Sequence, residues 1–133
     1  MKFLLIISHD EKFAPTPQLL RDIMAWVRTQ SRRKVRIGGE PLKPAGEAVT
    51  VRIRGGKLRT TPGPFAKSRE KICAYELVEV ANLDAAVALA ATHPMATAAT
   101  IEVRPVWEDL VSARPLLTVG SFRRTPAFRF SRR

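Results

Sequence analysis

The sequence predicts an α+β domain in which two β-α-β units share one sheet. An apolar strand pattern opens the chain at residues 2–8, and an amphipathic helix pattern follows at 17–30. The order strand, helix, strand then returns between residues 72 and 107, and an alternating stretch at 48–61 is inserted as a hairpin. Without the hairpin this is the split βαβ, or ferredoxin-like, order β-α-β-β-α-β.

The first β-α-β unit begins with an apolar run at 2–8 that is bounded by polar residues, as in a buried strand. Thr16 suits the N-cap of the helix and Pro17 its first position. Five apolar side chains at helical spacing form the predicted inward stripe: Leu19, Leu20, Ile23, Met24 and Val27. A short strand at 35–38 closes on Gly38-Gly39, which we expect to act as a flexible corner.

The inserted hairpin is predicted by strict alternation at 48–54, where valine and isoleucine occupy one face and Thr50, Arg52 and Arg54 the other. Gly55-Gly56 is a two-residue turn signal, and the chain returns through 57–61. Prolines then end the ladder at Pro62-Gly63-Pro64, because proline has no N–H to donate. We expect Phe65, on this rigid corner, to pin a loop to the core or to line the mouth of a pocket.

The second unit has the longest strand pattern, at 72–80. Asn82 can cap a helix over 83–92, where repeated alanines favour close packing against a sheet. Pro94 ends that helix, and alternation of apolar and charged residues predicts a last strand at 100–107.

The formal net charge of +11 divides between a body and a tail. Residues 109–133 hold six arginines and one aspartate, a net charge of +5, so residues 1–108 carry the remaining +6. We therefore divide the chain into one domain over 1–108 and a basic C-terminal arm over 109–133. The field favours anionic partners without specifying one.

Several classes of protein are disfavoured by the sequence. Cys73 is the single cysteine, which excludes an intrachain disulfide and a Cys-rich metal site. The apolar run at 3–7 is too short for a signal-peptide core or a membrane span, so we expect a cytoplasmic protein with no membrane contact. Motifs of P-loop, dinucleotide-binding, zinc-protease and serine-hydrolase enzymes do not occur, and nothing points to a cofactor.

Six segments along residues 1–108 then stand out together: GGEPL (38–42), VTVR (49–52), GPFA (63–66), LDAA (83–86), HP (93–94) and IEVRPV (101–106). In this order they resemble the YCII-related family, in its DGPF-domain branch. The resemblance implies a ferredoxin-like fold that commonly pairs as a dimeric α/β barrel, here a homodimer. It also implies links to sigma factors in some members and a dehydrochlorinase in one branch of the superfamily. The chain departs from the DGPF signature at Pro62, which replaces the aspartate, and at Lys67, which replaces an acidic residue.

Two histidines are candidate catalytic residues. His9 and Asp10 follow a strand end, where an imidazole beside a carboxylate can act as a general base. The alternative is a solvated loop with a turn-forming aspartate, and we favour it because no third partner is visible. His93 ends the second helix, where a cationic side chain complements the helix dipole; proton transfer is the alternative role.

The candidate ligand-binding residues are basic and aromatic. Arg52 and Arg54 share a strand face and can fork onto a carboxylate or phosphate, unless they are simply the solvated face of an edge hairpin. Arg104 lies on the face of the last strand that also carries a glutamate. Phe65 and Tyr75 can add an aromatic wall, although core packing explains both equally well.

We therefore predict an uncharacterised YCII-related dimer that binds a small anionic or aromatic ligand in a cavity between sheet and helices. One alternative is a lyase or dehydrochlorinase-like enzyme with a histidine general base. Another is a regulatory partner of a sigma factor or nucleic acid through the arm, in which three phenylalanines are interleaved with arginines.

Overall fold

The computed structural model describes residues 1–109, and the predicted basic arm lies, apart from Asp109, outside them. The main sheet has the strand order β2-β5-β1-β6, and every neighbouring pair is antiparallel. Its strands are β1 (Lys2–His9), β2 (Arg36–Pro41), β5 (Lys71–Glu79) and β6 (Thr100–Pro105). This order confirms the predicted ferredoxin-like α+β fold, in which each helix links two parallel strands that flank a third.

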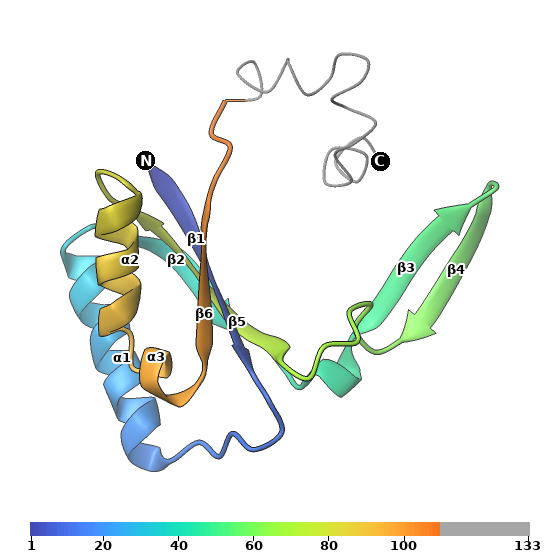
Figure 1. Ribbon diagram of the computed structural model, residues 1–133, viewed down its shortest axis with the longest axis horizontal. Helices are drawn as coiled ribbons and strands as arrows, with labels where there is room; N and C mark the ends of the chain where they lie inside the picture. The colour runs from blue at the N-terminus through green and yellow to red at the C-terminus, as the bar shows by residue number, and fades with distance from the viewer. Residues whose placement is uncertain (110–133) are drawn as a thin grey trace.

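Three helices lie on one side of the sheet (Figure 1): α1 (Pro17–Arg32), α2 (Leu83–Thr92) and the short α3 (Met95–Ala98). The core forms between them and the inward row of β1, whose members Phe3, Leu5 and Ile7 are almost completely buried. Val78 of β5 and Ala86 of α2 complete its centre. The repeated alanines of α2 let that helix approach the sheet closely, as the composition of the segment predicts.

Both predicted helix starts are confirmed in atomic detail. The Thr16 hydroxyl accepts a hydrogen bond from Leu19 N at 3.0 Å, and the Asn82 side chain accepts one from Ala85 N at 2.9 Å. These side chains satisfy backbone donors that a helix N-terminus leaves without an internal partner. Helix α3 was not predicted, because its N-cap residue is Pro94, which the sequence predicts as the end of α2, and no side chain caps it.

The predicted inward stripe of α1 is wrong at two positions. Leu19, Ile23 and Val27 face inward, but Leu20 is 53% exposed and Met24 is 58% exposed. The helix turns Trp26 into the core instead, where its indole Nε1–H donates to the Thr92 hydroxyl of α2 at 2.9 Å. One buried tryptophan thereby sets which face of the helix meets the sheet, and the flanking leucine and methionine rotate outward.

The prediction that Gly38-Gly39 is a flexible corner is also wrong, because both glycines lie inside β2 and pair with β5. The register shifts between Arg36 and Gly38, which marks a bulge. Gly39 has a positive φ of 149°, and a Cβ there would meet the Glu76 carboxylate and lie 2.5 Å from the Tyr75 carbonyl oxygen. Only glycine lets β2 approach β5 so closely.

The inserted hairpin, β3 (Val49–Arg54) and β4 (Lys57–Pro62), forms a two-stranded sheet of its own. Gly55 and Gly56 have φ values of 57° and 75°, as in a type I′ turn, which confirms the predicted hairpin. A 3₁₀ turn, η1 (Ala45–Glu47), precedes it. The hairpin projects away from the four-stranded sheet (Figure 1). From here on, "the arm" means this hairpin, and residues 109–133 are called the C-terminal segment.

Substitution of the two strand glycines should affect stability very differently. We expect Gly39→Ala to lower the free energy of unfolding by about 2–4 kcal/mol, because the new methyl group displaces a buried carboxylate and strains the backbone. Gly38→Ala is the matched control: no atom lies within 4 Å of a Cβ there, so we expect a change within about 0.5 kcal/mol. Urea unfolding of both variants measures the difference, and equal losses would contradict this account.

Candidate functional site

A carboxylate is buried under the helices at Glu76. Its neighbours along the inward row of β5 are Ala74 and Val78, and Glu76 itself is only 5% exposed. The Arg36 guanidinium on β2 donates from Nε to Glu76 Oε1 at 2.7 Å and from Nη2 to the Gly39 carbonyl at 2.8 Å. Because a buried charge is costly without a partner, this pair must form for β2 and β5 to align.

His93 is hydrogen-bonded to the second oxygen of the same carboxylate. Its Nε2 lies 3.2 Å from Glu76 Oε2, and its Nδ1 accepts a hydrogen bond from Met95 N at 3.0 Å. Because an accepting Nδ1 carries no proton, geometry assigns the ring proton to Nε2, which donates to Glu76. The ring is 2% exposed and packs against Trp26 at a centroid distance of 4.5 Å.

This Arg36–Glu76–His93 cluster joins β2, β5 and the turn between α2 and α3. Both carboxylate oxygens and both imidazole nitrogens are engaged, and neither Glu76 nor His93 lines the pocket described below. A general base needs a free lone pair within reach of a substrate proton. The cluster therefore acts as a structural joint in the described structure.

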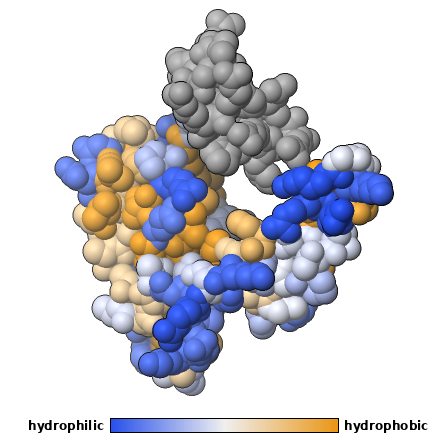
Figure 2. Space-filling view, turned by 45° about the vertical axis from the view of Figure 1, so that its right-hand side comes forward, coloured by the Kyte–Doolittle hydropathy of each residue, from blue (hydrophilic) through white to orange (hydrophobic). Residues whose placement is uncertain are grey.

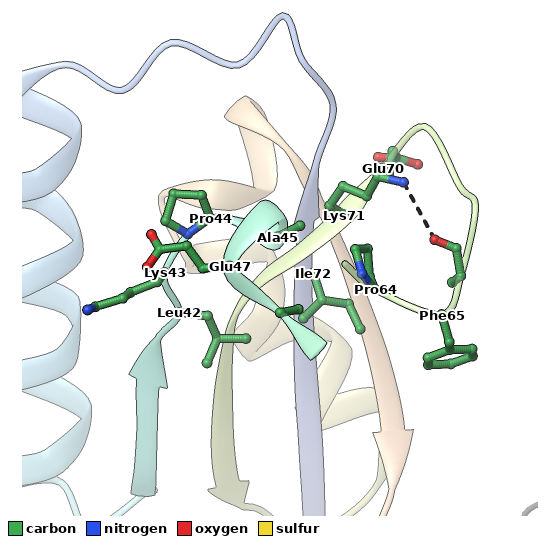
Figure 3. Close-up of a pocket in the computed structure, with 12 residues that line it drawn as sticks. Leu42, Lys43, Pro44, Ala45, Glu47, Pro64, Phe65, Glu70, Lys71 and Ile72 are labelled. Carbon is green, nitrogen blue, oxygen red and sulfur yellow. Dashed lines mark hydrogen bonds between the residues drawn. The ribbon is translucent and has the colours of Figure 1, made fainter. Parts of the chain in front are cut away.

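A pocket opens at the other end of β2 and β5 (Figure 3), with a cavity volume of about 480 Å³. Leu42 N donates to the Cys73 carbonyl at 2.8 Å, which fixes the end of β2 beside β5. The root of the arm is closed by Gly63 N donating to the Ala48 carbonyl at 2.7 Å. Turn η1 and the loop after Pro62 thus face each other, and most of their lining side chains are apolar.

The polar groups of the pocket are two lysines and two glutamates: Lys43, Glu47, Glu70 and Lys71. Lys71 Nζ donates to the Ala66 carbonyl at 3.5 Å, a long contact that leaves its other protons available (Figure 3). Glu70 Oε1 already accepts a hydrogen bond from the Thr100 hydroxyl at 2.5 Å. The Lys43 ammonium group points away from Phe65 and Lys71 (Figure 3). The pocket therefore combines an apolar wall with the accessible ammonium group of Lys71, which can hold an anionic group by a charge-assisted hydrogen bond.

The predicted site residues do not meet at one place. Phe65 is the predicted ligand residue that lines this pocket, at its edge, where it is 73% exposed. His9 Nδ1 donates to the Asp10 carbonyl at 2.8 Å, and its ring stacks on Phe13. The Asp10 carboxylate accepts from Lys12 N at 2.9 Å, as in a turn, so it does not orient the imidazole.

The remaining predicted residues lie on two further surfaces. Arg52 and Arg54 are exposed on the arm. Tyr75 points to the side of the main sheet opposite the helices, since its neighbour Glu76 points inward. Arg104 shares that side and forms an ion pair with Glu102, both well exposed. The pocket described above lies at the strand ends, and a cavity between sheet and helices stays a prediction.

Sequence reasoning missed Arg36, Glu76 and Lys71. Glu76 had a signal, because it occupies a position at which the alternation of the strand requires an apolar residue. Lys71 had none, because its role depends on a loop that folds back over the strand end. Among residues 1–109, no three acidic, histidine or cysteine side chains converge as metal ligands, and no described helix is long and apolar enough to cross a membrane.

A comparison with protein families matches the YCII-related domain to residues 1–109 of the chain. The chain belongs to the YCII-related family. A search of the curated proteins gave no match. The family match covers the whole described domain, and it confirms the resemblance to the YCII-related family.

Loss of the buried carboxylate should strongly destabilise this YCII-related domain. We expect Glu76→Leu to lower the free energy of unfolding by about 3–5 kcal/mol, because it leaves the Arg36 charge buried without a partner. Glu102→Leu is the matched control, since Glu102 also pairs with an arginine but is exposed, and it should cost less than about 1 kcal/mol. Urea unfolding tests both variants; similar losses at the two sites would contradict a buried joint.

Cys73 should react slowly with alkylating reagents. Burial raises the pKa of its thiol, and a hydrogen bond from its own backbone offsets this only in part. A raised pKa leaves less thiolate at any pH below it, and the thiolate is the reactive form. We expect the midpoint of the iodoacetamide rate against pH to lie higher in the folded protein than in urea. A midpoint at or below that of the unfolded chain would overturn the prediction.

Proposed function

We propose that this YCII-related protein binds a small ligand with an apolar or aromatic body and an anionic group, in the pocket at the root of the arm. The cavity volume of about 480 Å³ carries the proposal. It falls within the range of roughly 300–1,000 Å³ that is common for small-molecule sites, and its wall is mainly apolar. In this proposal the ligand body lies against Leu42, Ile72 and Phe65, and its anionic group meets Lys71.

The charge of the surrounding loop supports an anionic ligand. We place the chain in the DGPF branch of the family, which makes Pro62 the replacement of an aspartate and Lys67 the replacement of an acidic residue. Both changes make the loop beside the pocket more positive. Glu47 and Glu70 oppose this effect, but one oxygen of Glu70 already accepts a hydrogen bond from the Thr100 hydroxyl. In this proposal the anionic group lies on the Lys71 ammonium group.

We also propose that the protein is a homodimer that buries the side of the sheet opposite the helices, which we call the open face. One row across this face runs Glu40, Tyr75, Ile6 and Glu102. The next row carries Leu77 and Leu4. No described helix covers this side (Figure 1), and apolar side chains in the centre of a sheet normally have a cover.

The two alternative functions have less support. A lyase with a histidine base requires a free imidazole nitrogen at a cavity, whereas His93 is buried with both nitrogens bonded. Within residues 1–109 His9 Nε2 has no hydrogen bond, but the neighbouring Asp10 carboxylate holds a turn. Regulation of a sigma factor or nucleic acid through the basic C-terminal segment, residues 109–133, rests on the sequence alone.

Binding of simple aromatic carboxylates tests the proposal. We expect benzoate or phenylacetate to raise the thermal midpoint, since a ligand at one hundred times its Kd adds about 2.7 kcal/mol to the stability of the native state. Benzamide, which lacks the charge, should bind at least tenfold more weakly by titration calorimetry.

Two lysine variants locate the site. Lys71→Ala should weaken benzoate binding at least tenfold, because it removes the ammonium group proposed to hold the carboxylate. Lys57→Ala removes the same charge from the arm, outside the pocket lining, and should leave the Kd unchanged. Equal effects of the two substitutions, or no binding by any of the three probes, would overturn the proposed site.

A further inference from the structure

The arm presents an apolar face that no described element covers. Cross-strand pairing puts Val49, Val51 and Ile53 of β3 on the same face as Thr60 and Leu58 of β4. The four large apolar side chains of this face are 56–65% exposed. A two-stranded hairpin is only marginally stable on its own, and a contiguous exposed apolar patch marks an interaction surface.

The opposite face of the arm carries four basic side chains and two threonines. Arg52 lies across from Arg59, and Arg54 lies across from Lys57. Like charges directly opposite each other destabilise a hairpin. Within residues 1–109 none of these four side chains forms an ion pair, and the arm contains no acidic residue. The exposed apolar side chains and the opposed like charges therefore both destabilise the isolated hairpin. A partner that covers the apolar face and carries negative charge would stabilise it.

The root of the arm lies next to the open face. Ala48, at the start of the arm, lines the same pocket as Ile72. Ile72 pairs with Ser8 of β1, next to a bulge in the register, and is 52% exposed. The arm and the body are separated by a hollow, with apolar surface on the body and basic surface at the end of the arm (Figure 2). A molecule bound to the open face would therefore lie alongside the arm.

We propose that the arm is a dimerisation clasp: its apolar face packs on a second copy of this chain that is seated on the open face. This inference rests on the homodimer proposed above and adds which segment holds it together. Two-fold symmetry requires that one chain carry both halves of the contact. The chain does, because the open face is apolar along its centre and carries Glu40, Glu79 and Glu102, opposite in charge to the arm.

Charges on the open face are not all free. Glu102 pairs with Arg104, whereas neither Glu40 nor Glu79, which lies across from Lys2, forms an ion pair within residues 1–109. Glu40 stands at the edge strand β2. The arginines of the arm point away from the apolar contact, so they act through their field, which steers the approach of the acidic edge of the partner sheet.

A matched pair of aspartate substitutions tests the clasp. Val51→Asp puts a charge at the centre of the apolar face, and Thr61→Asp puts the same charge on the opposite face of the same hairpin. By sedimentation equilibrium we expect a dimeric wild type and a dimer Kd at least 100-fold higher for Val51→Asp. Thr61→Asp should change the Kd less than threefold. Trp26 fluorescence checks folding, because the core does not include the arm.

Cysteine labelling asks whether the apolar face itself is covered. In a Cys73→Ser background, Ile53→Cys and Thr61→Cys place single thiols on the two faces of the arm. Alkylation at position 53 should slow at least tenfold when the protein concentration rises from below to above the dimer Kd. Alkylation at position 61 should not change.

The outcomes separate the clasp from the proposed dimer. A wild-type dimer that Val51→Asp does not weaken, with position 53 always reactive, overturns the clasp: the copies then meet through the open faces alone and the arm serves another partner. A wild type that stays monomeric at all concentrations overturns both the dimer and the clasp. Dissociation by Val51→Asp together with protection of position 53 supports the clasp.

Discussion

The hydrogen-bonded carboxylate of Glu76 is the constraint on which the rest of the domain depends. It ties β2 to β5 through Arg36 and ties β5 to the end of α2 through His93. Gly39 must lack a side chain so that the carboxylate fits, and Trp26 must pack on the imidazole so that no water reaches it. A buried charge of this kind fixes one alignment of strands and helices, because any slip leaves it without partners.

That alignment decides where the surface features lie. With β2 fixed against β5, the chain leaves the sheet at Leu42, turns through η1 and returns at Lys71, and the space between the two crossings becomes the pocket. The arm starts and ends in the same loop region. Ligand site and proposed clasp therefore share one root, and a partner seated on the open face would lie close to the mouth of the pocket. By linkage, a ligand held at that boundary would also favour the dimer.

The distribution of charge has the same origin. The ferredoxin-like body keeps its few ion pairs within and across the main sheet, whereas the arm carries four cations without a counter-ion within residues 1–109. A hairpin that is apolar on one side and basic on the other does not contribute to its own core. Its sequence is understandable as part of an interface, where the apolar face is covered and the cations steer the approach of an acidic partner surface.

Local patterns determined the fold of this protein. The helix caps at Thr16 and Asn82, the Gly55-Gly56 turn and the alternation in the strands are encoded within a few residues, so the elements and their ferredoxin-like order could be read directly from the sequence. The family followed from short segments in order. Tertiary structure decided the rest. Neither the approach of Gly39 to Glu76, nor the rotation of α1 around Trp26, nor the meeting of η1 with the loop at Lys71 leaves a local pattern. Each depends on contacts between residues far apart in the chain, and only the packed sheet brings them together.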